Sequence, residues 1–147
     1  MADIDAKKEF DNGLALLKAG DTVRALGQFE KAMAEHPTSL CASYYAYCMA
    51  KERGHAKKGI ALCREALEKE PGTPAHYLNL ARIYLLGHNM LDAITILREG
   101  MQHAPDREIQ ELLSRIGERK PPVVPYLPRN SFINKYLGLL LSKLGWR

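Results

Sequence analysis

Residues 40–71, LCASYYAYCMAKERGHAKKGIALCREALEKEP, decide the fold, because the chain before and after this stretch repeats its layout. The landmarks of the stretch are, in order, Gly54, Gly59, Cys63, Ala66 and Pro71. One period of 34 residues earlier, the same places hold Gly20, Ala25, Phe29, Ala32 and Pro37. One period later, they hold His88, Ala93, Leu97, Gly100 and Pro105. Three prolines at a constant spacing, each ending a helical pattern, predict an array of helical repeats.

Helix start and stop signals predict seven helices in the first 119 residues, and no strands. Asp5 is a good N-cap for the first helix, Thr73 caps a fifth helix that opens on Pro74, and Asp106 caps the seventh. The predicted helices cover residues 5–18, 22–35, 40–53, 56–69, 74–86, 90–103 and 107–119. The last of them carries an apolar stripe suited to cover the open face of the preceding repeat, formed by Ile109, Leu112, Leu113 and Ile116.

This pattern resembles the tetratricopeptide repeat family over residues 6–119. The resemblance implies an all-α protein, built as a right-handed α-solenoid of three helical hairpins with a capping helix. We expect the array to occupy residues 1–119. Its repeats are expected at about 6–39, 40–73 and 74–107, with the capping helix at about 106–119.

The middle repeat departs from the family pattern at two positions that are normally small. The first repeat obeys the pattern with Gly13 and Ala25, and the third obeys it with Ala81 and Ala93. The middle repeat instead places Tyr47 at the eighth position and Gly59 at the twentieth. We interpret this pair as one compensated change, in which the glycine makes room for the tyrosine ring.

The family resemblance assigns ligand binding to the concave face, which is lined by the first helix of each repeat. The candidate groove residues are Lys7, Phe10, Leu14, Leu17, Tyr44, Cys48, Lys51, Leu78, Arg82 and Leu85. So many large apolar groups predict a groove for a peptide or an amphipathic helix, although Leu14 and Leu85 could instead pack between repeats. The basic residues among them are expected to select an acidic or carboxylate-bearing ligand.

One subclass of the family holds acidic C-terminal tails of chaperones with lysine, asparagine and arginine at fixed concave places. The places that this subclass uses hold Phe10, Leu14, Tyr45, Ala75 and Asn79 here. The clamp is therefore absent, which disfavours a co-chaperone role of that type.

The chain changes character after residue 119. Residues 120–130 hold four prolines within 121–128 and predict an extended, proline-rich arm. Residues 131–147 predict a basic amphipathic helix. Its apolar docking face consists of Phe132, Ile133, Tyr136, Leu137, Leu140 and Leu144. Because such an apolar helix is not stable alone in water, we expect it to bury against another surface.

Three surfaces could bury this helix. The favoured one is the groove of the same molecule or of a neighbour in a homodimer, because an 11-residue arm reaches roughly 34 Å at about 3.1 Å per residue. A separate protein is the second. The third, disfavoured, is an anionic membrane surface, which would make the chain a membrane-peripheral assembly factor. Nucleic acid is disfavoured because the six basic residues of the last 29 are interrupted by leucines.

No residue pattern predicts catalysis, a metal site or a cofactor. The three cysteines form no Cys-x-x-Cys pair, and an odd count suits reduced thiols in a cytoplasm. Cys63 is expected in the core, whereas Cys41 and Cys48 could be exposed on one helix face. The first residues do not pair a basic start with an apolar run, so no secretory leader is expected, and no run approaches the roughly 18 apolar residues of a membrane span. We therefore predict a non-catalytic, cytoplasmic scaffold or adaptor that binds proteins.

Overall fold

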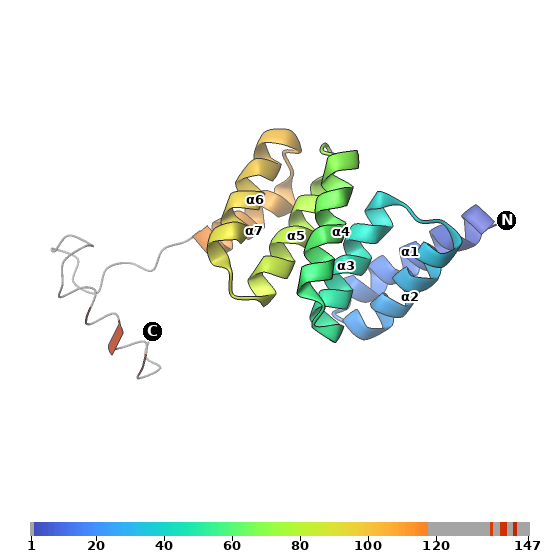
Figure 1. The fold of residues 1–147 in the computed structure, drawn as a ribbon, viewed down its shortest axis with the longest axis horizontal. Helices are drawn as coiled ribbons and strands as arrows, with labels where there is room; N and C mark the ends of the chain where they lie inside the picture. The colour runs from blue at the N-terminus through green and yellow to red at the C-terminus, as the bar shows by residue number, and fades with distance from the viewer. Residues whose placement is uncertain (1, 118–135, 137–138, 141–142, 144–147) are drawn as a thin grey trace. The chain divides into compact units, whose positions relative to one another are not determined.

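The computed structural model describes residues 2–117, 136, 139–140 and 143 (Figure 1). The chain divides into two compact units, Met1–Gly117 and Glu118–Arg147. The predicted arm at residues 120–130 lies outside the described residues, as do the predicted docking residues Phe132, Ile133, Leu137 and Leu144. The described residues of the second unit are helical.

The first unit consists of seven helices that follow one another along the array in chain order (Figure 1). They are α1 Ala2–Lys18, α2 Thr22–Glu35, α3 Ser39–Arg53, α4 Ala56–Lys69, α5 Pro74–Leu86, α6 Met90–His103 and α7 Arg107–Gly117. The predicted bounds of α2, α4, α5 and α6 are confirmed at both ends. Helix α1 begins three residues earlier than predicted, which places Asp5 inside the helix rather than at its N-cap. No strand occurs in the described residues.

Short polar side chains cap the N-termini of several of these helices. Asp21, Thr38 and Asn89 each accept a hydrogen bond from the backbone N–H three residues later, at 3.0, 3.1 and 3.3 Å. Asp106 accepts from the backbone N–H of Glu108 at 2.7 Å, as its predicted capping role requires. The prediction for Thr73 is wrong in one respect. Its hydroxyl makes no capping bond and instead donates to Glu70 at 3.4 Å.

The packing of the helices gives the array an inner and an outer side. Each hairpin pairs neighbours in sequence, and α3 also packs on α5, and α5 on α7. By contrast, among the described helices, α2 makes no extensive contact with α4, and α4 makes none with α6. The second helices of the hairpins (α2, α4 and α6) are thus spread apart, whereas α5 contacts both α3 and α7. The array therefore curves so that the first helices of the hairpins line its concave side.

Two buried clusters form the core. One surrounds Phe29 and Met49 in the first half of the array, and the other surrounds Tyr77, Leu80 and Leu97 in the second half. The predicted covering role of α7 is confirmed. Ile109 and Leu112 are buried within the second cluster, and Leu113 and Ile116 pack against it.

Gly59 allows the helices around it to approach closely, but for a different reason from the one the sequence suggested. A Cβ at Gly59 would lie 2.9 Å from the carbonyl oxygen of Ala46, 3.1 Å from Cδ1 of Ile83 and 3.3 Å from Cβ of Ala50. The Tyr47 ring is not among these nearest neighbours. The interpretation that Gly59 compensates for Tyr47 is therefore wrong, because the glycine admits the backbone of α3 and a side chain of α5.

Candidate peptide-binding groove

Three aromatic rings from three helices meet in the first half of the array. The ring centroids of Phe10 in α1, Phe29 in α2 and Tyr44 in α3 lie 5.7–5.8 Å apart. Phe29 is fully buried, whereas Phe10 and Tyr44 are half-buried and retain contact with solvent. Aromatic pairs at this separation are favourable beyond their buried area. The cluster therefore fixes two partly exposed rings on the concave side.

A small apolar hollow lies next to Phe10. Its volume is about 160 Å³. It is lined by Ala6, Lys7, Phe10, Ala32, His36, Thr38, Leu40 and Cys41. Leu14 and Leu17 continue the apolar surface along α1, and both are half-buried against the core cluster of the first half.

A larger and more polar hollow lies between α5 and α7. Its volume is about 760 Å³. It is lined by Leu78, Arg82, Glu108, Gln110, Glu111, Leu112, Ser114 and Arg115. Leu78 is almost fully buried at its floor, so the charged side chains of α5 and α7 provide most of its accessible groups.

Arg82 is the most constrained charged residue of this hollow. Its Nη1 donates to Oδ1 of Asn79 at 3.1 Å, and its Nη2 lies 3.8 Å from Oε2 of Glu108. The guanidinium carbon lies 5.7 Å from the ring centroid of Tyr47, at cation–π distance. Contacts from α3, α5 and α7 therefore hold the guanidinium of a side chain that is still 31% exposed.

The Asn79 contact is anchored by a buried polar chain. Nδ2 of Asn79 donates to Oγ of Ser43 at 3.2 Å, and Oγ of Ser43 donates to the carbonyl oxygen of Leu40 at 3.0 Å. Asn79 and Ser43 are fully buried. Because a buried amide must find partners for both its oxygen and its nitrogen, this chain fixes the orientation of the Asn79 oxygen toward Arg82.

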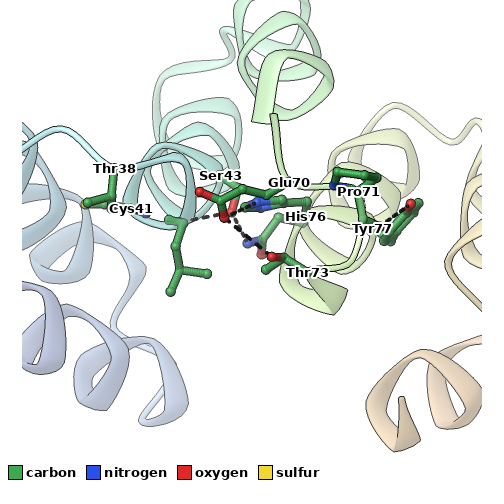
Figure 2. A network of polar contacts seen from close by, with 10 residues as sticks. Thr38, Cys41, Ser43, Glu70, Pro71, Thr73, His76 and Tyr77 are labelled. Atoms are coloured by element: carbon green, nitrogen blue, oxygen red, sulfur yellow. Dashed lines mark hydrogen bonds and ion pairs between the residues drawn. The ribbon is translucent and has the colours of Figure 1, made fainter. Parts of the chain in front are cut away.

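A second polar network surrounds the turn between α4 and α5 (Figure 2). His76 is fully buried, and neither ring nitrogen makes a hydrogen bond within the described part of the chain, although Nε2 lies 3.4 Å from Oε2 of Glu70. Burial lowers the pKa of His76, and the Glu70 carboxylate opposes this shift. Close by, the Tyr77 hydroxyl donates to the carbonyl oxygen of Pro71 at 2.8 Å.

The structure corrects the predicted role of the cysteines. Cys48 was predicted to line the groove and is fully buried, and Cys41 is also buried, because α3 is enclosed by α2 and α5. Burial raises the pKa of the Cys41 thiol to about 11 and the pKa of the Cys48 and Cys63 thiols to about 12. Unreactive thiols of this kind are typical of a core and not of a binding surface.

The other predicted groove residues divide into two groups. Phe10, Leu14, Leu17, Tyr44 and Leu85 are half-buried and pack against the core with part of their surface. Lys7 and Lys51 are exposed. Sequence reasoning did not identify Ser43 or Asn79 as supports of Arg82, since the contact between Ser43 and Asn79 joins residues 36 positions apart.

Residues 50–116 match the sequence model of a family described as tetratricopeptide repeat. The structure is similar to the crystal structure of the P58(IPK) TPR domain, with a TM-score of 0.58 and 21% sequence identity. The helical array has the fold of a tetratricopeptide repeat domain. The similarity covers 76% of this chain and 33% of that chain, so this chain spans about a third of the length of the solved chain. No curated protein matches the chain in sequence.

Within the described residues, no helix has both the length and the apolar character needed to cross a membrane. The same residues contain no group of three or more His, Cys, Asp or Glu side chains placed to hold a metal ion.

Proposed function

We propose that the protein is a non-catalytic interaction scaffold whose concave groove binds a peptide or an amphipathic helix of a partner protein. The observation that carries this proposal is the pair of half-buried rings, Phe10 and Tyr44, which are held by Phe29 on the side lined by the first helices. A rigid, partly exposed aromatic pair is suited to anchor an apolar side chain of a ligand. Leu14 and Leu17 extend the same surface.

The basic side chains near this surface support the selection of an acidic ligand. Lys7 borders the small hollow beside Phe10, and Arg82 borders the large hollow between α5 and α7. Lys51 is exposed near the end of α3. Charged groups around an apolar groove contribute to the orientation of a ligand and to its association rate.

The C-terminal helix is one candidate occupant of the groove. Its described apolar residues, Tyr136, Leu139 and Leu140, are more than half exposed. An exposed apolar helix face is the kind of ligand that such a groove accepts, either within one molecule or between two. Binding of this helix to a separate protein or to a membrane surface is the alternative.

The groove can be tested with a displayed library of peptides that carry leucine at i, i+3, i+4 and i+7. We expect panning against the full chain to enrich peptides whose affinity falls at least tenfold in the Leu14→Ala variant. The matched control is Leu67→Ala, since Leu67 is also half-buried but lines a hollow between α4 and α6 on the outer side. Enriched peptides that respond to Leu67→Ala but not to Leu14→Ala would contradict the proposal.

The role of the C-terminal helix can be tested by light scattering after gel filtration, comparing the full chain with a chain ended at Lys120. A dimer that becomes a monomer on truncation supports exchange of the helix between molecules. If both are monomers, peptide binding that improves on truncation supports occupation of the groove in the same molecule. Co-sedimentation of the full chain with anionic vesicles, lost on truncation, would favour the membrane alternative.

A further inference from the structure

Arg82 presents a guanidinium that is fixed on one side and open on the other. The fixed side bonds to Asn79, which is held by the buried Ser43, and the guanidinium lies over the ring of Tyr47. The open side faces the hollow of about 760 Å³ between α5 and α7. Within the described residues, no hydrogen bond uses Nε or Nη2, so most of the five guanidinium N–H donors remain available.

Among the described residues, Glu108 is the one carboxylate in an ion pair with this open side, and the ion pair is loose. The distance between Nη2 of Arg82 and Oε2 of Glu108 is 3.8 Å, and the Glu108 side chain is 70% exposed. In the same helix, the Glu111 carboxylate lies only 2.7 Å from Nε of Arg107. An exposed, distant ion pair contributes little to stability and is easily exchanged. The contacts of Arg82 with Asn79 and Tyr47 are therefore the fixed part of this site, whereas Glu108 is a partner that a ligand can replace.

We infer that Arg82 is the anchor for an acidic side chain of the bound helix, and that Glu108 occupies the place of this acid when the groove is empty. This inference rests on the proposed function. A ligand carboxylate at 2.7–2.9 Å could use two parallel N–H donors of the guanidinium, which is a stronger interaction than the present contact. The ligand acid then displaces Glu108 toward solvent, where its charge remains hydrated.

The charges around Arg82 favour a ligand with one acidic side chain at this position and disfavour a basic ligand. Arg115 borders the same hollow and adds a second positive charge, while Glu111 is engaged by Arg107. Leu78 and Leu112 provide an apolar floor on which the carbon chain of an aspartate or glutamate can lie. The inference thus names the ligand class as an amphipathic helix with an acidic residue beside its apolar face.

The experiment uses peptides enriched from the leucine-patterned library on the full chain, each synthesised with its acidic residue as glutamate or as glutamine. We expect the glutamate form to bind roughly tenfold tighter than the glutamine form. This preference should disappear in Arg82→Gln and weaken in Arg82→Lys, which keeps the charge but not the two parallel donors.

The proposed displacement of Glu108 predicts that removing its charge strengthens peptide binding, whereas the Arg82 substitutions weaken it. Glu108→Gln should bind the glutamate peptide several-fold tighter than the wild type, because the internal competitor is removed. The control is Glu65→Gln, which makes the same change in net charge at an exposed ion pair with Lys69 in α4. Equal tightening in both variants would overturn the displacement, since it would show only an effect of net charge.

The failures of the inference and of the proposed function differ. Peptides that enrich and respond to Leu14→Ala, but bind equally as glutamate and glutamine, would overturn the Arg82 anchor and leave the groove intact. If no leucine-patterned peptide enriches, the proposed groove function fails and this inference fails with it. Thermal unfolding of each Arg82 variant serves as the folding check, and Arg82→Lys carries the test if Arg82→Gln is unfolded.

Discussion

Gly59 in α4 lies so close to Ala46 in α3 that a Cβ at the glycine would be 2.9 Å from the Ala46 carbonyl oxygen. A backbone oxygen cannot move aside as a flexible side chain can. The two helices of the middle hairpin must therefore separate if the glycine is replaced.

We predict that Gly59→Ala destabilises the protein by about 1–3 kcal/mol through overpacking. This loss exceeds the gain of up to about 1 kcal/mol that alanine brings through its helix propensity. Gly27→Ala is the matched control, because Gly27 lies within α2 and a Cβ there meets nothing within 4 Å. Urea unfolding should show lower stability for Gly59→Ala and higher stability for Gly27→Ala. Equal shifts in one direction would contradict the packing argument.

The buried hydroxyl of Ser43 gives a second prediction. Ser43→Ala removes the acceptor of Asn79 Nδ2 inside the array, which should cost about 1–3 kcal/mol. Thr95→Ala is the control, since the Thr95 hydroxyl also donates to a carbonyl in its own helix, at 2.9 Å, but is exposed. The control should change stability by less than about 0.5 kcal/mol. A Ser43→Ala variant as stable as the control would show that Asn79 finds another partner.

The pH dependence of stability should depend on His76. Because burial lowers its pKa in the folded state, the unfolded chain binds the proton more readily. Stability is therefore full at a pH above the ordinary histidine pKa of about 6.5 and falls as the pH drops through that range. Glu70, 3.4 Å away and half exposed, reduces this loss by favouring the protonated ring.

His76→Leu should flatten the fall in melting temperature between pH 7.5 and pH 5, because it removes the titrating group. His55→Gln is the control, since His55 is exposed at the turn between α3 and α4. An unchanged pH profile in His76→Leu would assign the acid sensitivity to other groups.

The cysteines provide a measure of local opening. Cys41, Cys48 and Cys63 are buried, and burial raises the pKa of their thiols to about 11, 12 and 12. We expect iodoacetamide at pH 8 to label all three far more slowly in the folded protein than in urea. A thiol that reacts in the folded state as fast as in urea would show that its part of α3 or α4 opens readily.

The helices were predictable from sequence because their ends carry strong local signals. Pro37, Pro71 and Pro105 recur every 34 residues, and Gly54 ends α3 with a φ of 70° that glycine adopts without strain. The apolar face of α7 was likewise predictable, because its apolar residues recur at the spacing of a helix. Thr73 was misassigned because its hydroxyl turns to Glu70, and such a choice depends on tertiary packing.

The details of the groove were less predictable. Family positions predicted Phe10, Tyr44 and Arg82, which are partly accessible in the structure, but they also included Cys48, which is fully buried. The rotation of α3 between α2 and α5 decides which of its residues are buried, and α3 is apolar around much of its circumference. The contact between Ser43 and Asn79 depends on that same rotation, so no local pattern announces it.

The outer side of the array contains two open spaces, of about 190 Å³ between α2 and α4 and about 260 Å³ between α4 and α6. Helices α3, α5 and α7 are in contact along the inner side, so the array can bend about this line of contacts. The open spaces on the outer side leave room for α2, α4 and α6 to approach one another. Straightening the array would use this clearance and widen the concave side without breaking the inner contacts. The protein is therefore expected to be mechanically compliant in one direction, with the curvature of the array adjusting to the width of its ligand.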